Sequence, residues 1–398
     1  VLARHMPSSA SQTRSTSTVV VAGVSSGVGK TTAAIGLMHT LHRQGYRVQP
    51  FKVGPDFLDG MHHEAACGVP SINLDGWMLG ERGCLAAFHA ACTRSHADIA
   101  IVEGCMGLHD GRDGCSDEGS TAQIAKWLRA PVLLVLDAWC LSRSAAAMVH
   151  GYKTFDADVH LAGCLFNRVA GLAHGTWLRQ AMASANSVAD VAVLGCLPSD
   201  KSLIVKERLL GLLPPVASGT TDTTADSPLL AALHRLLTEH VDLGELRAIA
   251  AQADVPPVPP VAMPLIPIDS GHQQHPHSSL PPVRVAVARD AAFCFLYHDN
   301  LHLLRSAGAQ IVPFSPLSDD APPRDADALY LIGGYPELHA PRLQANAKMR
   351  GAIKRICEDG RTFVWAECGG LMMLAQRLIR RPEDVRTAAD AAADAAAD

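Results

Sequence analysis

The stretch Val19-Val-Val-Ala-Gly-Val-Ser-Ser-Gly-Val-Gly-Lys-Thr-Thr32 decides the fold of this chain. Its β-branched start predicts a buried strand, its glycines predict a loop, and the residues from Thr32 to Arg43 predict the helix that follows. Such a loop binds phosphate, because backbone N–H groups, the positive end of a helix and a lysine converge on one point. The residues expected to bind nucleotide phosphates here are Gly27, Gly29, Lys30, Thr31 and Thr32.

The loop departs from the strict G-x-x-x-x-G-K-[ST] pattern. Val24 stands where the first glycine is expected, and Gly23 lies one residue earlier. A structural glycine turn is therefore the alternative interpretation. The strand before the loop and the amphipathic helix after it favour a nucleotide site, with the Thr31 hydroxyl available to Mg²⁺.

The composition predicts a globular protein of two domains. The chain has 398 residues, 48% hydrophobic and 18% charged, and a single core rarely exceeds about 300 residues. A net charge of −5 offers no footprint for nucleic acid, and apolar stretches such as Pro131–Leu136 are too short to span a membrane. The 11 cysteines include no C-x-x-C pair, which favours a reducing, cytoplasmic location.

Strands and helices alternate over residues 18–254, which predicts a mostly parallel sheet wrapped by helices. Chemistry in such sheets collects at the carboxyl ends of the strands. Asp56 and Glu103 follow two of these ends and could hold Mg²⁺ together with Thr31. The alternatives are a turn residue for Asp56 and a surface carboxylate for Glu103. The expected strands are Val19–Ala22, Arg47–Lys52, Ile99–Glu103, Val132–Leu136, Leu161–Phe166 and Val193–Leu197. Asn167 follows the fifth of these strands, and its amide is expected to hydrogen-bond a nucleotide base.

A second α/β unit is expected over residues 283–380, after a Pro-rich linker at 255–282. A strand at Thr362–Ala366 runs into Glu367-Cys-Gly-Gly370 and a helix at Leu371–Arg380, which predicts a nucleophile elbow with Cys368 in the turn. Gly334 could supply an oxyanion-binding N–H group. A lone buried cysteine is usually inert, which is the alternative interpretation. The ends of the chain, 1–17 and 381–398, are expected to be a disordered lead-in and a low-complexity tail.

Taken together, these motifs resemble the cobyrinic acid a,c-diamide synthase family, glutamine-dependent enzymes of corrinoid biosynthesis. The resemblance runs from about Thr18 to Leu374 and rests on motifs in a fixed order. They include Gly23–Thr32, Gln49–Asp59, Asn73–Leu79, Val102–Gly111, Asn167-Arg168, Ala292–Phe295, Pro313–Leu317, Gly333–Glu337 and Ala366–Leu374.

The resemblance implies a P-loop NTPase domain similar to dethiobiotin synthetase, followed by a class I glutamine amidotransferase-like domain. Cys368 would release ammonia from glutamine, while MgATP would activate carboxylates of a corrinoid substrate as acyl phosphates for amidation. The family positions near the substrate are matched by Phe57, Leu58, Asp59 and Asp110. A homodimer is an open alternative for the assembly.

The sequence departs from the resemblance after Cys368, because amidotransferases of this class use a later histidine and none follows here. We expect a truncated amidotransferase domain with weak glutaminase activity and surviving ammonia-driven amidation. Other open interpretations are a cobyric acid synthase, a nickel-tetrapyrrole diamide synthase, a partitioning ATPase and a non-catalytic nucleotide-binding fragment. The absence of a basic patch and the fused Cys368 unit speak against a partitioning ATPase.

Overall fold

The computed structural model describes residues 16–200, 207–208, 211–212, 227–258 and 282–379. These residues divide into two compact units on either side of the Pro-rich segment. The predicted tail at 381–398, most of the predicted lead-in and most of the predicted linker lie outside the described residues. From the linker region, Val255 and Val258 pack against the core of the first unit.

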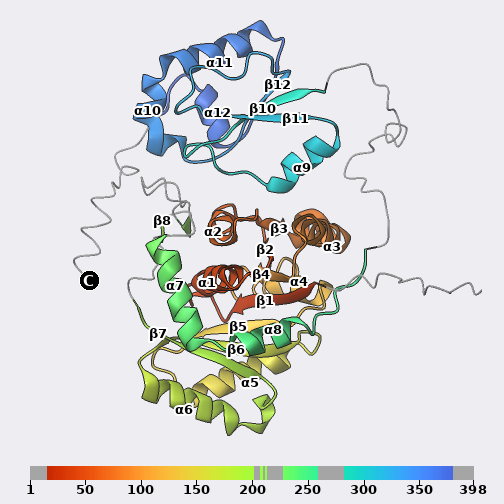
Figure 1. Cartoon of the computed structure of the whole chain (residues 1–398), viewed down its shortest axis with the longest axis vertical. Coiled ribbons are helices and arrows are strands. Elements are labelled where there is room, and N and C mark those ends of the chain that lie inside the picture. Colours follow the sequence, from red (N-terminus) through yellow and green to blue (C-terminus); the bar gives the residue numbers. More distant parts are fainter. Residues whose placement is uncertain (1–15, 201–206, 209–210, 213–226, 259–281, 380–398) are drawn as a thin grey trace, which may run out of the picture. The chain divides into compact units, whose positions relative to one another are not determined.

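The first unit contains a seven-stranded parallel sheet in the order β3-β2-β4-β1-β5-β6-β7 (Figure 1). The prediction of a mostly parallel sheet is confirmed. The three-residue edge strand β3 was not predicted, because so short a segment carries little periodic signal. The strands are β1 (Ser17–Gly23), β2 (Val48–Val53), β3 (Ile72–Leu74), β4 (Ile99–Glu103), β5 (Val132–Asp137), β6 (Leu161–Val169) and β7 (Ala192–Pro198).

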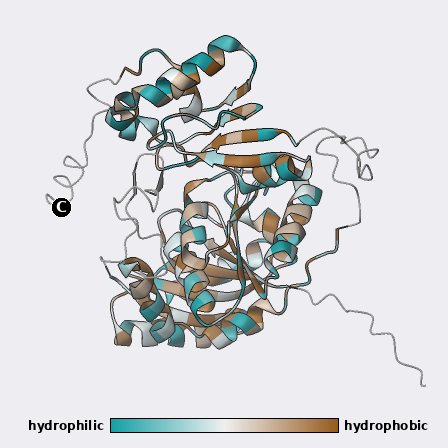
Figure 2. Ribbon diagram, turned by 45° about the horizontal axis from the view of Figure 1, so that its top comes forward, coloured by the Kyte–Doolittle hydropathy of each residue, from teal (hydrophilic) through white to brown (hydrophobic). Residues whose placement is uncertain are grey.

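Helices cover both faces of this sheet, since successive side chains of a strand point to opposite sides. Val19 and Val21 of β1 pack with α1 (Lys30–Arg43), α2 (Leu58–Cys67), α7 (Pro228–His240) and α8 (Leu243–Ala250). Val20 and Ala22 belong to the opposite core, with α3 (Gly76–Ser95), α4 (Thr121–Trp127), α5 (Ser144–Phe155) and α6 (Leu172–Ala183). Figure 2 shows hydrophobic residues concentrated on the strands between these helices. A short helix at Asn186–Val188 and a hairpin of β8 (Glu207–Arg208) and β9 (Gly211–Leu212) complete the described elements.

Helix α1 begins at Lys30, two residues before the start that the sequence predicted. Gly29 is its N-cap residue and adopts a left-handed conformation with φ 92°. The glycine loop therefore leads straight into the first helical turn. Lys30 and Thr31 consequently lie inside that turn rather than before it.

The second unit has a smaller parallel sheet in the order β11-β10-β12-β13. Its strands are β10 (Arg284–Ala288), β11 (Gln310–Phe314), β12 (Ala328–Leu331) and β13 (Phe363–Ala366). Its helices are α9 (His298–Ser306), α10 (Ala340–Ala345), α11 (Ala347–Asp359) and α12 (Gly369–Leu374), with a 3₁₀ turn at Pro336–His339. The predicted helix at Leu371–Arg380 is wrong in its bounds. Helix α12 begins at Gly369 and ends at Leu374, because Ala375 is extended with ψ 147°.

No helix in the described part of the chain is long and apolar enough to cross a membrane.

Candidate functional site

Side chains from β6, two strands away from β1 in the sheet, contact the phosphate loop. Asn167 of β6 donates a hydrogen bond from Nδ2 to the Val28 carbonyl at 2.9 Å. A Cβ built on Gly29 would come within 2.1 Å of that Nδ2 atom, so Gly29 leaves room for the Asn167 amide. The residue expected near a nucleotide base is therefore in contact with the loop backbone.

Arg168, beside Asn167, also contacts the loop. Its Nη2 atom donates to the Gly27 carbonyl at 2.9 Å, and its Nη1 atom pairs with Asp137 at 2.5 Å. The parallel register of β5 and β6 places Asp137 opposite Asn167, which explains this pairing. A Cβ built on Gly27 would have nothing within 4 Å, so space does not require glycine there. The positive φ of 77° is the feature that favours glycine at this position.

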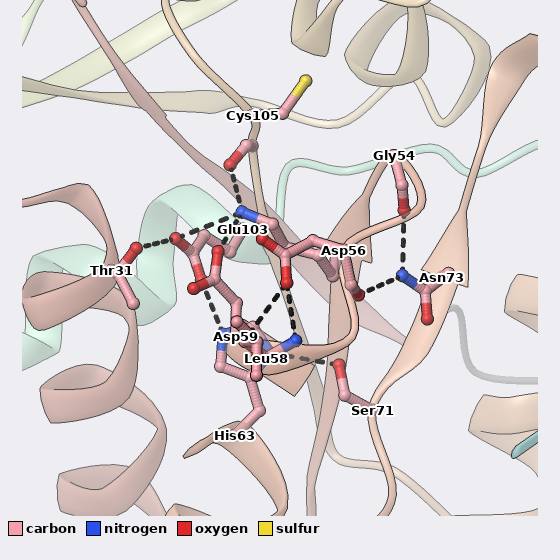
Figure 3. Close-up of polar contacts among 12 residues, drawn as sticks. Thr31, Gly54, Asp56, Leu58, Asp59, His63, Ser71, Asn73, Glu103 and Cys105 are labelled. Carbon is pink, nitrogen blue, oxygen red and sulfur yellow. Dashed lines mark hydrogen bonds and ion pairs between the residues drawn. The ribbon is translucent and has the colours of Figure 1, made fainter. Parts of the chain in front are cut away.

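A cluster of buried charges lies immediately behind Thr31 (Figure 3). The register of β2 and β4 sets Lys52 beside Glu103. Lys52 Nζ lies 2.6 Å from Asp59 Oδ2, 3.4 Å from Glu103 Oε1 and 2.9 Å from the Gly104 carbonyl. Thr31 Oγ1 donates to Glu103 Oε1 at 2.5 Å. Glu103 is 0% exposed, so the alternative interpretation of it as a surface carboxylate is wrong.

The charges in this cluster shift one another's protonation. Burial by itself would raise the pKa of Glu103, but Lys52 and the hydrogen bond from His63 hold that pKa well below its usual range. Burial would lower the pKa of Lys52, yet the Glu103 and Asp59 carboxylates raise it. Burial, reinforced by the charge of Glu103, raises the pKa of Asp59 to about 6. Burial also lowers the pKa of Lys30.

Asp56 lies just before Phe57, the N-cap residue of the helix that carries Asp59. Its Oδ1 atom accepts hydrogen bonds from the backbone N–H groups of Leu58 at 2.6 Å and Asp59 at 3.2 Å. Asn73 of β3 fixes the same loop, since its Nδ2 atom donates to the carbonyls of Gly54 and Asp56, each at 2.8 Å. These contacts fit the turn interpretation of Asp56, and its metal role stays a prediction.

His63 and Lys52 also belong to the cluster, although neither was predicted as a site residue. His63 Nε2 lies 2.6 Å from Glu103 Oε2, and its Nδ1 lies 3.0 Å from Ser71 Oγ. Lys52 is a charged residue in a strand that is buried throughout, which was a usable signal. His63 follows Asp59 by four residues on α2 and so shares its helix face. That relation needs the helix bounds, which the sequence did not predict.

Thr31 and Glu103 present oxygen atoms of the type that Mg²⁺ prefers. Mg²⁺ is commonly held by one or two carboxylates together with phosphate oxygens and water, rather than by a cage of protein groups. The described residues contain no group of three or more His, Cys, Asp or Glu able to hold a metal ion. The donor set fits a magnesium ion that arrives with a nucleotide.

The residues predicted to lie near a substrate occupy different environments. Leu58 and Asp59 are buried in the first turn of α2, whereas Phe57 is partly exposed. Asp110 is exposed, and its Oδ2 atom accepts a hydrogen bond from the Gly107 N–H group at 2.9 Å. Of the four side chains, Phe57 and Asp110 are the ones that reach the surface of the first unit.

In the second unit, Cys368 lies in a tight turn between β13 and α12. Its backbone has φ 50° and ψ −116°, an unusual conformation for a residue with a side chain. Cys368 is exposed, so the interpretation as a buried inert cysteine is wrong. The neighbouring glycines permit the turn, because a Cβ on Gly370 would lie 2.0 Å from the Leu331 carbonyl.

The predicted oxyanion loop adjoins this turn. A Cβ on Gly333 would lie 3.5 Å from Cys368 Sγ, and one on Gly369 would lie 3.0 Å from the Gly334 nitrogen. A Cβ on Gly334 would meet the Ala292 carbonyl at 2.2 Å. The strand ends of β12 and β13 therefore bring Gly333, Gly334 and Cys368 together. This arrangement suits attack by a thiol on a carbonyl group.

The fold and the two sites define a two-unit protein: a P-loop nucleotide-binding unit followed by a glutamine amidotransferase-like unit. Residues 19–209 match the family described as "CobQ/CobB/MinD/ParA nucleotide binding domain". Residues 284–391 match the "CobB/CobQ-like glutamine amidotransferase domain". The chain as a whole belongs to the cobyrinate a,c-diamide synthase family, as its relatives show.

Three of these relatives are named cobyrinate a,c-diamide synthase. The protein from Listeria monocytogenes is 42% identical over 90% of this chain and 75% of its own length. The protein from Syntrophotalea carbinolica is 43% identical over 90% of this chain and 73% of its own length. The protein from Methanosarcina acetivorans is 39% identical over 94% of this chain and 73% of its own length.

Proposed function

We propose that this chain is an ATP-dependent ligase that amidates the a- and c-carboxylates of cobyrinic or hydrogenobyrinic acid. Family membership and the two matched domains support a glutamine-dependent amidation. One observation carries the finer proposal: the chain combines a phosphate loop backed by the Thr31–Glu103 pair with an exposed cysteine elbow.

In the first unit the nucleotide would lie on the loop between β1 and α1. The residues assigned to it are Gly27, Gly29, Lys30, Thr31, Thr32 and Asn167, with Thr31, Glu103 and Asp56 at Mg²⁺. The metal, when bound, would neutralise phosphate charge and so favour transfer of the γ-phosphoryl group. Lys30 is 8% exposed at the start of α1, where its ammonium adds positive charge to the helix end.

A carboxylate is a poor acyl donor until one of its oxygens becomes part of a good leaving group. Transfer of the γ-phosphoryl group to a substrate carboxylate would give an acyl phosphate and ADP. Ammonia would then attack the acyl carbon and release phosphate, leaving the amide. The residues assigned to the substrate side are Phe57, Leu58, Asp59 and Asp110.

In the second unit Cys368 would attack the side-chain amide of glutamine, and the N–H group of Gly334 would stabilise the resulting oxyanion. Hydrolysis of the acyl-enzyme would then yield glutamate. The ammonia released in the first step is the nitrogen source for the ligase reaction.

The test is ATP hydrolysis with cobyrinic and hydrogenobyrinic acids, with glutamine or ammonium as the nitrogen donor and the product identified by mass. We expect ADP and a diamide with ammonium, and the comparison of donors measures how much glutamine use the chain retains. A Lys30→Met variant is the matched control for background hydrolysis. Absence of ADP and of any amide with either corrinoid would contradict the proposal.

A further inference from the structure

His63 is a fully buried polar side chain that the proposed chemistry leaves without a role. It lies on α2 with 0% exposure, in the cluster drawn in Figure 3. Its two ring nitrogens face different partners: Nδ1 lies 3.0 Å from Ser71 Oγ, and Nε2 lies 2.6 Å from Glu103 Oε2. A buried imidazole with both nitrogens engaged has one ring orientation.

The partner of Nε2 fixes the direction of that hydrogen bond. The Glu103 carboxylate oxygen accepts the 2.6 Å hydrogen bond, so Nε2 carries the hydrogen and donates. The Ser71 hydroxyl can either donate or accept, so it is a partner for Nδ1 in either direction. His63 therefore links Ser71 to the Glu103 carboxylate, which also accepts a hydrogen bond from Thr31.

The two oxygens of Glu103 are thereby assigned to different tasks. Oε2 accepts from His63, while Oε1 accepts from Thr31 and faces Lys52 at 3.4 Å. The terminal torsion of a glutamate is broad, so without a donor on Oε2 the carboxylate could rotate away from Thr31. A donor on Oε2 holds Oε1 beside the Thr31 hydroxyl.

We infer that His63 is a positioning residue that orients Glu103, so that Glu103 Oε1 and Thr31 Oγ1 together form the protein side of the Mg²⁺ site. The inference rests on the proposed function, in which these two oxygens hold the metal of MgATP. Hydrogen-bond partners of metal-binding groups commonly change metal affinity about 10- to 100-fold when they are lost. His63 does not itself touch the nucleotide or the metal.

Two substitutions separate the two nitrogens of the ring. In His63→Gln the amide nitrogen can reach the position of Nε2 and still donate to Glu103. In His63→Asn the shorter amide reaches only the position of Nδ1, so Glu103 loses its donor. His160→Asn makes the same change at an exposed histidine of the first unit and serves as the control.

The measurement is the dissociation constant of ATP by titration calorimetry, with 5 mM Mg²⁺ or with EDTA. We expect the Mg²⁺-dependent gain in affinity to fall about tenfold in His63→Asn, to stay within about threefold of wild type in His63→Gln, and to be unchanged in His160→Asn. Affinity in EDTA should be the same in all four proteins, which a general loss of structure would not give.

Several outcomes would overturn the inference. One is an unchanged Mg²⁺ gain in His63→Asn, and another is an equal loss in folded His63→Gln and His63→Asn proteins. If His63→Asn does not fold, Ser71→Ala gives the decision: a loss of about threefold supports the inference and no change overturns it. Wild-type protein that binds ATP equally well with and without Mg²⁺ would overturn the proposed function as well, whereas the preceding outcomes leave that function standing.

Discussion

Replacing Gly29 with alanine tests how tightly the phosphate loop is held, and Gly27→Ala is its matched control. Both residues have positive φ, 92° and 77°, so each alanine adopts a left-handed conformation at about 1–2 kcal/mol. Only at Gly29 does the new methyl group meet a neighbour, because its Cβ would lie 2.1 Å from Asn167 Nδ2. Around Gly27 a Cβ has nothing within 4 Å.

The Asn167 amide must move to admit the methyl group, and it then loses its 2.9 Å hydrogen bond to the Val28 carbonyl. That bond contributes about 1 kcal/mol. We therefore expect Gly29→Ala to lower the unfolding free energy of the first unit by about 2–3 kcal/mol and Gly27→Ala by about 1–2 kcal/mol. In an Asn167→Ala background the cost of Gly29→Ala should fall by about 1 kcal/mol, because the obstacle is gone.

Urea unfolding followed by tryptophan fluorescence measures these values. The signal reports mainly on the first unit, since every tryptophan of the chain except Trp365 lies there. Equal destabilisation by Gly27→Ala and Gly29→Ala would refute the reasoning. So would strict additivity of Gly29→Ala and Asn167→Ala.

Three further outcomes are expected. Cys368→Ser should abolish amidation supported by glutamine and keep amidation supported by ammonium within about twofold, with the product measured by mass. Cys357→Ser, at another exposed cysteine, should change neither rate. Burial gives Asp59 a folded pKa of about 6, above the unfolded value of about 3.9. The free energy of unfolding of metal-free wild type, relative to that of Asp59→Asn, should therefore fall by up to about 3 kcal/mol as pH rises from about 4 to about 6. A difference in urea midpoints that does not change with pH would contradict this. Asp75 is the N-cap residue of α3, and its carboxylate accepts hydrogen bonds from Trp77 N–H at 3.0 Å and Met78 N–H at 2.8 Å. Asp75→Ala should lower the free energy of unfolding by about 1 kcal/mol in the same urea assay. An unchanged urea midpoint would be the contrary result.

The fold could be predicted from the sequence because its strands are runs of apolar, often β-branched residues ended by glycine or polar residues. Val19–Ala22 and Val132–Leu136 are buried throughout, as such runs imply. β3 could not be predicted, because three residues are too few for a periodic signal. The end of α12 was misplaced, because Gln376 to Arg380 contain no residue that stops a helix.

The contact between Thr31 and Glu103 could be predicted, because a motif and a strand end coincide there. Lys52 and His63 meet Glu103 through the register of β2 with β4 and through the rotation of α2, which a single sequence does not specify. For Asn167 a contact with a nucleotide base stays a prediction, and the structure adds a hydrogen bond from its amide to the Val28 carbonyl. The sequence placed this polar group at a strand end but did not predict its contact with the loop backbone.

The central position of β1 has a consequence for synthesis of the chain. β1 is paired on one side by β4, with Val19 opposite Ile101, and on the other by β5, with Val20 opposite Val132. At about 5–20 residues per second, the ribosome delivers the second partner on the order of 10 s after β1 itself. Through that interval the apolar strand before the phosphate loop has no complete sheet to enter. Nucleotide in the cell can therefore stabilise the finished unit but cannot guide the first steps of its folding.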